Sequence, residues 1–256
     1  MKFKFIIFIC LFSSQLAFSK TLVISDIDDT IKVTNVLSKT DAVINGIFSK
    51  KAFSGMSELY QVFNQNNDNI YYLSGSPAIL KEVVGGFLDY NNFPQSDNLI
   101  LKSDSLSTYE YKVRNIRKLI LKLKPDSLIL IGDDTQFDPE VYQKIFEENP
   151  EIVKSIYIRA IKNRKIPDNF LFNNFFSSVE IAGQEMLNGT MDSDNLSDVT
   201  KGFINQSKNS QVFIRGRYCP PNGRTKIDEL KHKMSEQLAI DSLELTQQKI
   251  ISTCRK

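Results

Sequence analysis

Two aspartates stand two positions apart, directly after a short apolar run. Residues 21–25 read TLVIS, and Asp26, Asp28 and Thr30 follow at once. Residues two apart can face the same way where a strand opens into a loop. Clustered carboxylates repel one another, and a hard divalent cation with oxygen ligands, typically Mg²⁺ beside phosphate, offsets that repulsion. The pattern favours a metal site at Asp26 and Asp28; the alternative is an acidic turn that only caps a helix.

A second acidic cluster follows residues 127–131 (SLILI), which are typical of a buried strand. Asp133 and Asp134 come shortly after this run, and Asp138 stands at the start of a predicted helix. In a parallel sheet the carboxyl ends of the strands meet at one edge, where ligands bind. We therefore expect these carboxylates to join the first pair. The alternative is a turn followed by an N-cap, a role that we expect of Asp138 in either case.

Hydroxyls and a lysine could hold an anion at the same edge. Ser74, Gly75 and Ser76 follow a strand predicted over 69–73, and hydroxyls and backbone N–H groups at a helix start bind anions. For Ser76 we expect a plain N-cap instead. Lys112, on a helix before the SLILI strand, could balance phosphoryl charge. Four neighbouring basic residues are alternatives for that role: Lys102, Arg114, Arg117 and Lys118.

Apolar runs alternate with amphipathic segments through most of the chain. We predict strands over 21–25, 69–73, 99–101, 127–131 and 153–161, and helices over 57–63, 78–90, 109–123 and 139–148. Continuous apolar strands separated by helices are typical of a parallel sheet covered on both faces. The expected fold class is therefore α/β, with a doubly wound, mostly parallel sheet.

The first 19 residues have the pattern of a secretory signal peptide. Lys2 and Lys4 precede an unbroken apolar run over 5–12, and a small-x-small motif ends at Ser19. That run is too short to span a bilayer comfortably. We expect cleavage after Ser19, a secreted or periplasmic protein and no transmembrane span afterwards; the alternative is an uncleaved membrane anchor.

Charge and composition exclude several classes of function. The chain has 32 Lys+Arg and 30 Asp+Glu, and loss of two lysines with the signal leaves equal numbers. No nucleic-acid partner is expected from that balance. A single histidine, His232, excludes a His-rich zinc site and makes a His-dependent triad implausible. Cys219 and Cys254 remain, and an oxidising compartment favours a disulfide between them over two buried thiols.

The amino-acid composition changes after about residue 185. Residues 188–210 are rich in Asn, Ser, Asp and Gly and read as loop or linker. Residues 211–217 look like a strand, and 225–252 like one long helix or two with a break near 239–242. We therefore expect three segments: a signal peptide at 1–19, an α/β domain at 20–185 and a C-terminal extension at 186–256.

Taken together, the motifs resemble those of the haloacid dehalogenase superfamily. Four of them occur in that superfamily's order and spacing: DIDDT at 26–30, LSGSP at 73–77, Lys112 and GDDTQFD at 132–138. More narrowly, ISDIDDTIK, YLSGSPAIL and LIGDDTQFDPEVY look like the phosphatidate phosphatase catalytic domain associated with yeast actin patches, over roughly residues 20–185. Gly75 stands where members often carry Asn, and Asp134 where they often carry Ser, which leaves the choice of substrate open.

The resemblance implies Mg²⁺-dependent hydrolysis of phosphomonoesters through a phosphoaspartate. Asp26 would be the nucleophile, and Asp28 would protonate the leaving group and then activate water. The resemblance also implies that Asp26, the backbone carbonyl of Asp28 and Asp133 hold the metal.

The same resemblance assigns the phosphoryl-binding groups. Ser74 and the N–H of Gly75 or Ser76 would hold the phosphoryl oxygens, and Lys112 would supply positive charge. Asp138 would orient Lys112 or a metal-bound water.

The size of the site bears on its substrate. Only 43 residues separate Thr30 from Ser74, too few for a large α/β cap domain, and an open site suits a lipid phosphate such as phosphatidate. The alternatives are a soluble nucleotide or sugar phosphate, or a catalytically idle protein that binds a partner through its extension.

Four phenylalanines are candidates for an apolar surface that a lipid could approach, although core packing suits most of them better: Phe48, Phe53, Phe87 and Phe93.

Overall fold

The computed structural model describes residues 20–38, 49–165, 171–205, 210–214, 217–220 and 226–254. The predicted signal peptide at 1–19 and Phe48 lie outside the described residues.

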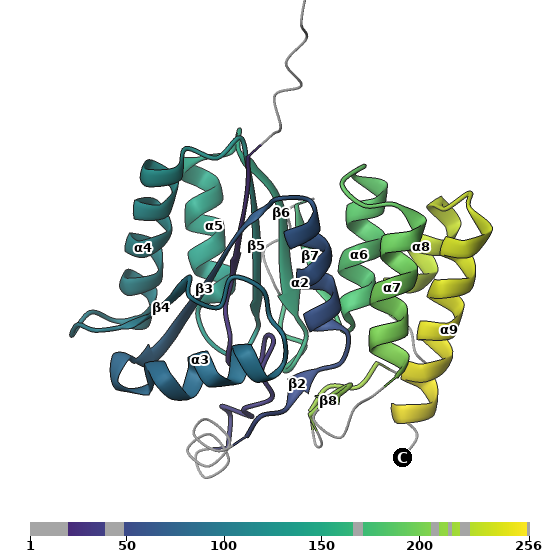
Figure 1. The fold of residues 1–256 in the computed structure, drawn as a ribbon, viewed down its shortest axis with the longest axis horizontal. Helices are drawn as coiled ribbons and strands as arrows, with labels where there is room; N and C mark the ends of the chain where they lie inside the picture. Colours follow the sequence, from purple (N-terminus) through teal and green to yellow (C-terminus); the bar gives the residue numbers. More distant parts are fainter. Residues whose placement is uncertain are drawn as a thin grey trace, which may run out of the picture.

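A six-stranded parallel sheet forms the centre of the molecule (Figure 1). Its strands are β1 (Thr21–Ser25), β3 (Asn69–Pro77), β4 (Leu99–Lys102), β5 (Ser127–Asp133), β6 (Val153–Arg159) and β7 (Phe172–Phe175). The order across the sheet is β4-β3-β1-β5-β6-β7, and each neighbouring pair is parallel. The predicted α/β fold class is confirmed. β7 was not predicted, because Asn173 and Asn174 interrupt its apolar pattern.

Helices cover both faces of this sheet (Figure 1). Leu22 and Ile24 of β1 face a cluster formed with α4 (Thr108–Leu123) and α5 (Asp138–Glu148), whereas Val23 faces the opposite cluster. That opposite side carries α2 (Met56–Gln65), α3 (Lys81–Tyr90) and α6 (Ser178–Leu187). Successive strand residues point to opposite faces, so the side chains of an unbroken apolar strand are buried in two hydrophobic cores, one on each face of the sheet. Three of the candidate phenylalanines belong to the second core and are at most 3% exposed: Phe53, Phe87 and Phe93.

The prediction of a loop or linker over 188–210 is wrong, because the segment contains helix α7 (Ser193–Ile204). Asp192 begins the helix by accepting a hydrogen bond from the Asn195 N–H at 2.8 Å. Leu196, Val199 and Phe203 recur at helical spacing and are buried against the rest of the molecule. The polar composition concealed this stripe, because the many Asn, Ser and Asp residues occupy the outer face and the ends.

The rest of the extension also differs from its predicted layout. Among the described residues of the strand predicted over 211–217, Gln211 alone lies in a strand, β8 (Ser210–Gln211), which pairs in parallel with β2 (Ala52–Phe53). The two final helices are α8 (Ile227–Lys233) and α9 (Gln237–Cys254), so the break precedes the predicted position at 239–242. Apolar residues of α7, α8 and α9 belong to the same core cluster as Val23. The extension therefore packs as part of the molecule.

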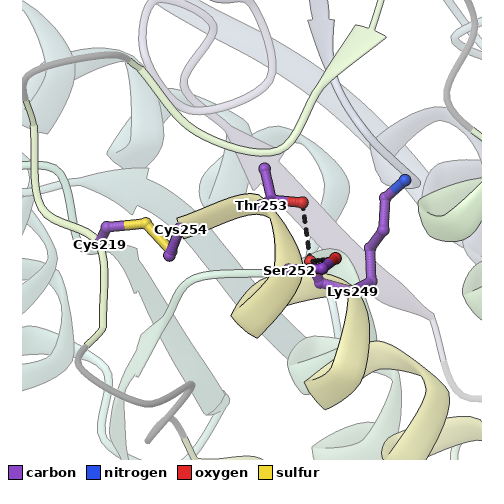
Figure 2. Close-up of a disulfide and its surroundings, with 5 residues drawn as sticks. All are labelled: Cys219, Lys249, Ser252, Thr253 and Cys254. Atoms are coloured by element: carbon purple, nitrogen blue, oxygen red, sulfur yellow. Dashed lines mark hydrogen bonds between the residues drawn. A yellow bond between two sulfur atoms is a disulfide. The ribbon is translucent and has the colours of Figure 1, made fainter. Parts of the chain in front are cut away.

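The predicted disulfide between Cys219 and Cys254 is present (Figure 2). It joins the last residue of α9 to the segment that follows β8, and the two Cα atoms lie 5.8 Å apart. Within the described part of the chain, none of the helices combines the length and the hydropathy that a membrane crossing requires.

Candidate active site

The predicted site residues meet around one cavity of about 350 Å³ at the carboxyl ends of β1, β3 and β5. Its lining includes all seven of them: Asp26, Asp28, Ser74, Gly75, Lys112, Asp133 and Asp138. Thr34, Ser76, Thr108 and Gln136 are among the other lining residues. Strand order explains the convergence, since β1 lies between β3 and β5 in the sheet.

Asp26 is buried at the end of β1 and is held on both sides. Its backbone N–H donates to the Ile131 carbonyl of β5 at 2.9 Å. Its Oδ1 accepts a hydrogen bond from Lys112 Nζ at 2.8 Å, and its Oδ2 accepts one from Thr30 Oγ1 at 3.3 Å. Burial raises the pKa of Asp26 to about 7, although the Lys112 charge lowers it.

Lys112 is the basic side chain that reaches the cavity. It lies on α4, whose start is fixed by a capping box between Ser107 and Glu110. Burial lowers the pKa of Lys112, but the Asp138 and Asp26 charges outweigh burial and raise it above its usual range. The side chain is therefore a buried cation. Among the alternatives, Arg114 pairs with Asp104 and Arg117 with Glu148, and neither lines the cavity.

Asp138 does not cap α5, contrary to the sequence-based expectation. Phe137 occupies the N-cap position without a side-chain hydrogen bond, and Asp138 is the first helical residue. Its Oδ1 accepts a hydrogen bond from Lys112, and its Oδ2 accepts one from the Asp133 N–H at 3.3 Å. A Cβ at Gly132 would lie 2.5 Å from Asp138 Oδ2. The glycine therefore gives the Asp138 carboxylate room to reach Lys112.

Three buried carboxylates could hold a metal ion. One oxygen each from Asp26, Asp133 and Asp138 lie within 4.8 Å of one another. Asp133 Oδ1 accepts a hydrogen bond from the Thr135 N–H at 2.5 Å, and its Oδ2 accepts one from Thr30 Oγ1 at 3.3 Å. Burial raises the pKa of Asp133 well above its usual range, and the neighbouring Asp138 and Asp26 charges raise it further.

The charge balance fits a hard divalent cation. Three ionised carboxylates beside the single ammonium of Lys112 leave an excess of two negative charges in a buried space. A divalent ion would cancel that excess, and an all-oxygen donor set suits Mg²⁺. Burial is the main cause of the raised pKa values of Asp26 and Asp133, and repulsion from neighbouring carboxylates adds to it.

Asp28 points into a separate group of hydroxyls. Its Oδ1 accepts a hydrogen bond from Thr34 Oγ1 at 2.7 Å, and its Oδ2 accepts bonds from Ser74 Oγ at 3.2 Å and Ser76 Oγ at 2.9 Å. The Ser76 N–H donates to Ser74 Oγ at 3.0 Å. Ser76 is not an N-cap, because β3 continues to Pro77 and the following short helix, Ala78–Leu80, has no side-chain cap.

Gly75 and Asp134, the two departures from the family pattern, have different surroundings in the structure. A Cβ at Gly75 would lie 2.8 Å from Thr108 Cγ2, so a larger residue there would push against α4. Asp134 is buried outside the cavity lining, and its carboxylate accepts hydrogen bonds from three backbone N–H groups after β6. Asp134 thus organises a loop, and does not face the cavity.

Arg159 supports the site and was not predicted. Its guanidinium carbon lies over the rings of Phe53 and Phe175, at 4.0 and 4.5 Å from their centroids. Its Nε donates to the Thr30 carbonyl at 2.9 Å, and the hydroxyl of Thr30 contacts both Asp26 and Asp133. The sequence contains no signal for this role, because Arg159 ends an ordinary apolar strand 129 residues after Thr30.

The fold is α/β, and its cavity gathers four carboxylates and a buried lysine at the carboxyl edge of the sheet. The chain belongs to the family of the phosphatidate phosphatase APP1 catalytic domain, whose model matches residues 21–160. The matched segment contains the seven predicted site residues.

Two curated fungal proteins are similar to part of this chain. Phosphatidate phosphatase APP1 of Saccharomyces cerevisiae is 28% identical over 157 residues, which is 55% of this chain and 26% of that protein. An uncharacterized protein of Schizosaccharomyces pombe is 24% identical over 150 residues, 54% of this chain and 25% of that protein. The chain thus aligns with about a quarter of the length of each of these relatives.

Two solved structures resemble the chain distantly. A class C acid phosphatase from Bacillus anthracis aligns with a TM-score of 0.36 and 14% identity, over 53% of this chain and 65% of that one. A UDP-N-acetylglucosamine 2-epimerase from Rickettsia bellii aligns with a TM-score of 0.38 and 11% identity, over 74% and 49%.

Proposed function

We propose that this chain is a Mg²⁺-dependent phosphomonoesterase of the haloacid dehalogenase type, acting through a phosphoaspartate on Asp26. One observation carries the proposal: the buried ammonium of Lys112 joins Asp26 to Asp138, beside Asp133 and at the wall of the cavity that Asp28 also lines. A carboxylate nucleophile, a fixed cation and a second carboxyl with a different environment are the groups that phosphoryl transfer to an aspartate requires.

The metal would be held by Asp26, Asp133 and the backbone carbonyl of Asp28, with Asp138 close to the same position. When bound, Mg²⁺ supplies positive charge that stabilises the phosphoryl oxygens in the transition state. Asp138 accepts a hydrogen bond from Lys112, which supports the proposal that Asp138 orients this lysine.

The chain's own residues carry the bond changes. A carboxylate oxygen of Asp26 forms a bond to phosphorus as the ester oxygen leaves, and Asp28 gives that oxygen a proton. Asp28 then takes a proton from water, which attacks the acyl phosphate and releases inorganic phosphate and the free Asp26 carboxylate. Lys112 remains protonated throughout and attracts the phosphoryl group. Ser74, with the N–H of Gly75, completes the phosphoryl contacts in this proposal.

We further propose a lipid phosphate as substrate. The name of the Saccharomyces cerevisiae relative supports phosphatidate. Two large apolar side chains beside the cavity lining also support a lipid: Ile79 is 89% exposed two residues after Pro77, and Phe137 is 48% exposed directly after Gln136. Soluble nucleotide or sugar phosphates remain the second candidate, favoured by the polar cavity wall.

The Cys219–Cys254 disulfide supports the proposed secreted or periplasmic location, since disulfides persist in oxidising compartments. Cleavage of the predicted signal after Ser19 would leave Lys20 as the first residue. Lys20 is already positioned by its backbone N–H, which donates to Asp126 Oδ2 at 2.8 Å.

The decisive test is phosphate release by residues 20–256 with Mg²⁺ and with EDTA. The substrates are phosphatidate in mixed micelles and para-nitrophenyl phosphate, each with the wild-type protein and with Asp26→Asn. Release from phosphatidate that needs both Mg²⁺ and Asp26 is the expected result. Release from the small ester alone would keep the mechanism and exclude the lipid. Equal release by Asp26→Asn, or no release from either substrate, would overturn the proposal.

A further inference from the structure

Thr34 ties Asp28 to a loop outside the sheet. The serines of β3 contact Asp28 Oδ2, whereas Thr34 Oγ1 donates to Asp28 Oδ1 at 2.7 Å. Asp28 is therefore held between the end of a strand and the segment around Thr34. Thr34 holds one carboxylate oxygen and the serines hold the other, so a shift of the Thr34 segment would turn the Asp28 carboxyl.

Asp29 fixes the backbone of this segment. Its Oδ1 accepts hydrogen bonds from the N–H groups of Thr34 at 2.9 Å and Asn35 at 2.6 Å, and its Oδ2 accepts one from Val36 at 2.7 Å. Asn35 has a φ of 59°, in the left-handed region that asparagine tolerates better than most residues. The segment is thus a defined turn around a buried carboxylate.

The C-terminal extension contacts the same turn. Arg217 donates to Asn35 Oδ1 from Nε at 3.0 Å and from Nη2 at 2.9 Å, across 182 residues of sequence. Two donors on one amide oxygen restrict both the position and the direction of the Asn35 side chain. The family match ends at residue 160, so Arg217 belongs to the part of the chain outside it.

Two further contacts anchor the backbone next to Arg217. The Tyr218 N–H donates to the Ile161 carbonyl at 3.1 Å, which joins this segment to the loop after β6. Cys219 forms the disulfide with Cys254 at the end of α9 (Figure 2). Figure 1 shows that α9 ends on the same side of the molecule as the carboxyl edge of the sheet. The backbone beside Arg217 is therefore held in place, and the Arg217 side chain reaches the turn from a fixed position.

We infer that Arg217 is a positioning residue for Asp28, acting through Asn35 and Thr34. The inference rests on the proposed function, because it assigns to Asp28 the protonation of the leaving oxygen. Without Arg217 the turn loses these two hydrogen bonds from the extension and keeps those to Asp29, so the Thr34 hydroxyl holds the Asp28 carboxyl less firmly in one direction. Proton delivery then becomes less efficient, while the Asp26 and Lys112 positions are unchanged.

The leaving group provides a specific readout of this role. An alkoxide needs a proton as it departs, whereas para-nitrophenolate departs readily without one. The values of kcat/KM are measured for para-nitrophenyl phosphate and for the better of two alkyl esters, short-chain phosphatidate and glycerol phosphate. Arg217→Ala is expected to lower the alkyl value about tenfold and the aryl value less than threefold.

Matched variants distinguish positioning from a general loss of structure. Arg117→Ala is the control. Arg117 also donates from Nε and Nη2 to one side chain, that of Glu148, and neither residue lines the cavity. The kcat/KM values of this variant should equal those of wild type for both esters. Arg217→Lys retains one charged donor and should recover part of the alkyl activity. Thr34→Val removes the hydroxyl itself and should reproduce the selective alkyl loss.

The outcomes separate this inference from the proposed function. Equal losses with the two esters in Arg217→Ala and Thr34→Val, or no loss in either, would overturn the positioning role. If the wild-type protein is active and Arg217→Ala matches Arg117→Ala on both esters, only this inference fails. If wild type and Asp26→Asn are equally active or both inactive, the proposed function fails first.

Discussion

Lys112 Nζ lies 2.8 Å from Asp26 Oδ1, although 86 residues separate the two in the sequence. The same ammonium also contacts Asp138. Both carboxylates and the lysine are buried, so the ion pairs have little competition from water. This bridge joins the start of the sheet, α4 and α5, and it places a permanent positive charge beside the proposed nucleophile.

Replacement of Asp26 by Asn separates catalysis from folding. The Asp26→Asn protein is expected to lose at least about a thousandfold in kcat, because an amide oxygen cannot form the acyl phosphate. Its thermal midpoint should fall by no more than a few degrees, since Lys112 retains Asp138 and an unfavourable buried charge is removed. Phosphate release measures kcat, and a circular dichroism melt of the same preparation measures the thermal midpoint. Residual activity within tenfold of wild type would contradict the mechanism.

Replacement of Lys112 by Met leaves the three carboxylates without their cation. We expect loss of activity and a destabilisation of about 3–5 kcal/mol in EDTA, because breaking a buried pair leaves uncompensated charge. Saturating Mg²⁺ should recover part of the lost stability, since the ion supplies charge to the same carboxylates. Urea unfolding with and without Mg²⁺ measures this. Lys118→Met, on an exposed position of the same helix, is the control and should change neither quantity.

The metal-free protein should become less stable as the pH rises from about 4 to 7. Burial raises the pKa of Asp26 from 3.8 to about 7, so the native state binds this proton more tightly than the unfolded chain. The stability linked to that proton is complete below pH 3.8 and is lost as the pH passes through 7. Asp133 has a raised pKa for the same reason and adds to the trend.

Metal binding needs the ionised carboxylates, so the effect of Mg²⁺ on stability should have the opposite trend. The difference between the thermal midpoints in Mg²⁺ and in EDTA is expected to grow from pH 5 to pH 8. Differential scanning fluorimetry across this range, with Asp26→Asn alongside, measures it. A difference that is constant with pH would show that the ion binds elsewhere.

Removal of the disulfide should destabilise the fold by about 2–4 kcal/mol, mainly by relaxing the unfolded state. The bond closes a loop across a sequence separation of 35 residues and holds the end of α9. The double variant Cys219→Ser, Cys254→Ser is compared with wild type in urea, and wild type with a reductant is the second sample. A midpoint equal to that of wild type in both would contradict this prediction.

Local patterns in the sequence were sufficient for five of the six strands of the central sheet and for seven of the residues that line the cavity. Continuous apolar runs predicted the strands that became β1, β3, β4, β5 and β6, because burial on both faces leaves no polar alternation. Residues that follow those runs must lie at the carboxyl edge, which is why Asp26, Ser74 and Asp133 line one cavity. The even pair of cysteines likewise indicated the disulfide.

Side-chain partners depended on the tertiary structure. Local signals favoured Asp138 and Ser76 as helix caps, since those signals are strong, and only the family resemblance suggested that Asp138 orients Lys112. The fold instead brings Lys112 to Asp138 and Asp28 to Ser76, because strand order and helix packing place these distant residues together. The packing of α7 and the contact of Arg217 with Asn35 have the same origin. Hydrophobic periodicity in the sequence indicates which face of a helix or strand is buried. Which residues that face contacts depends on the tertiary structure.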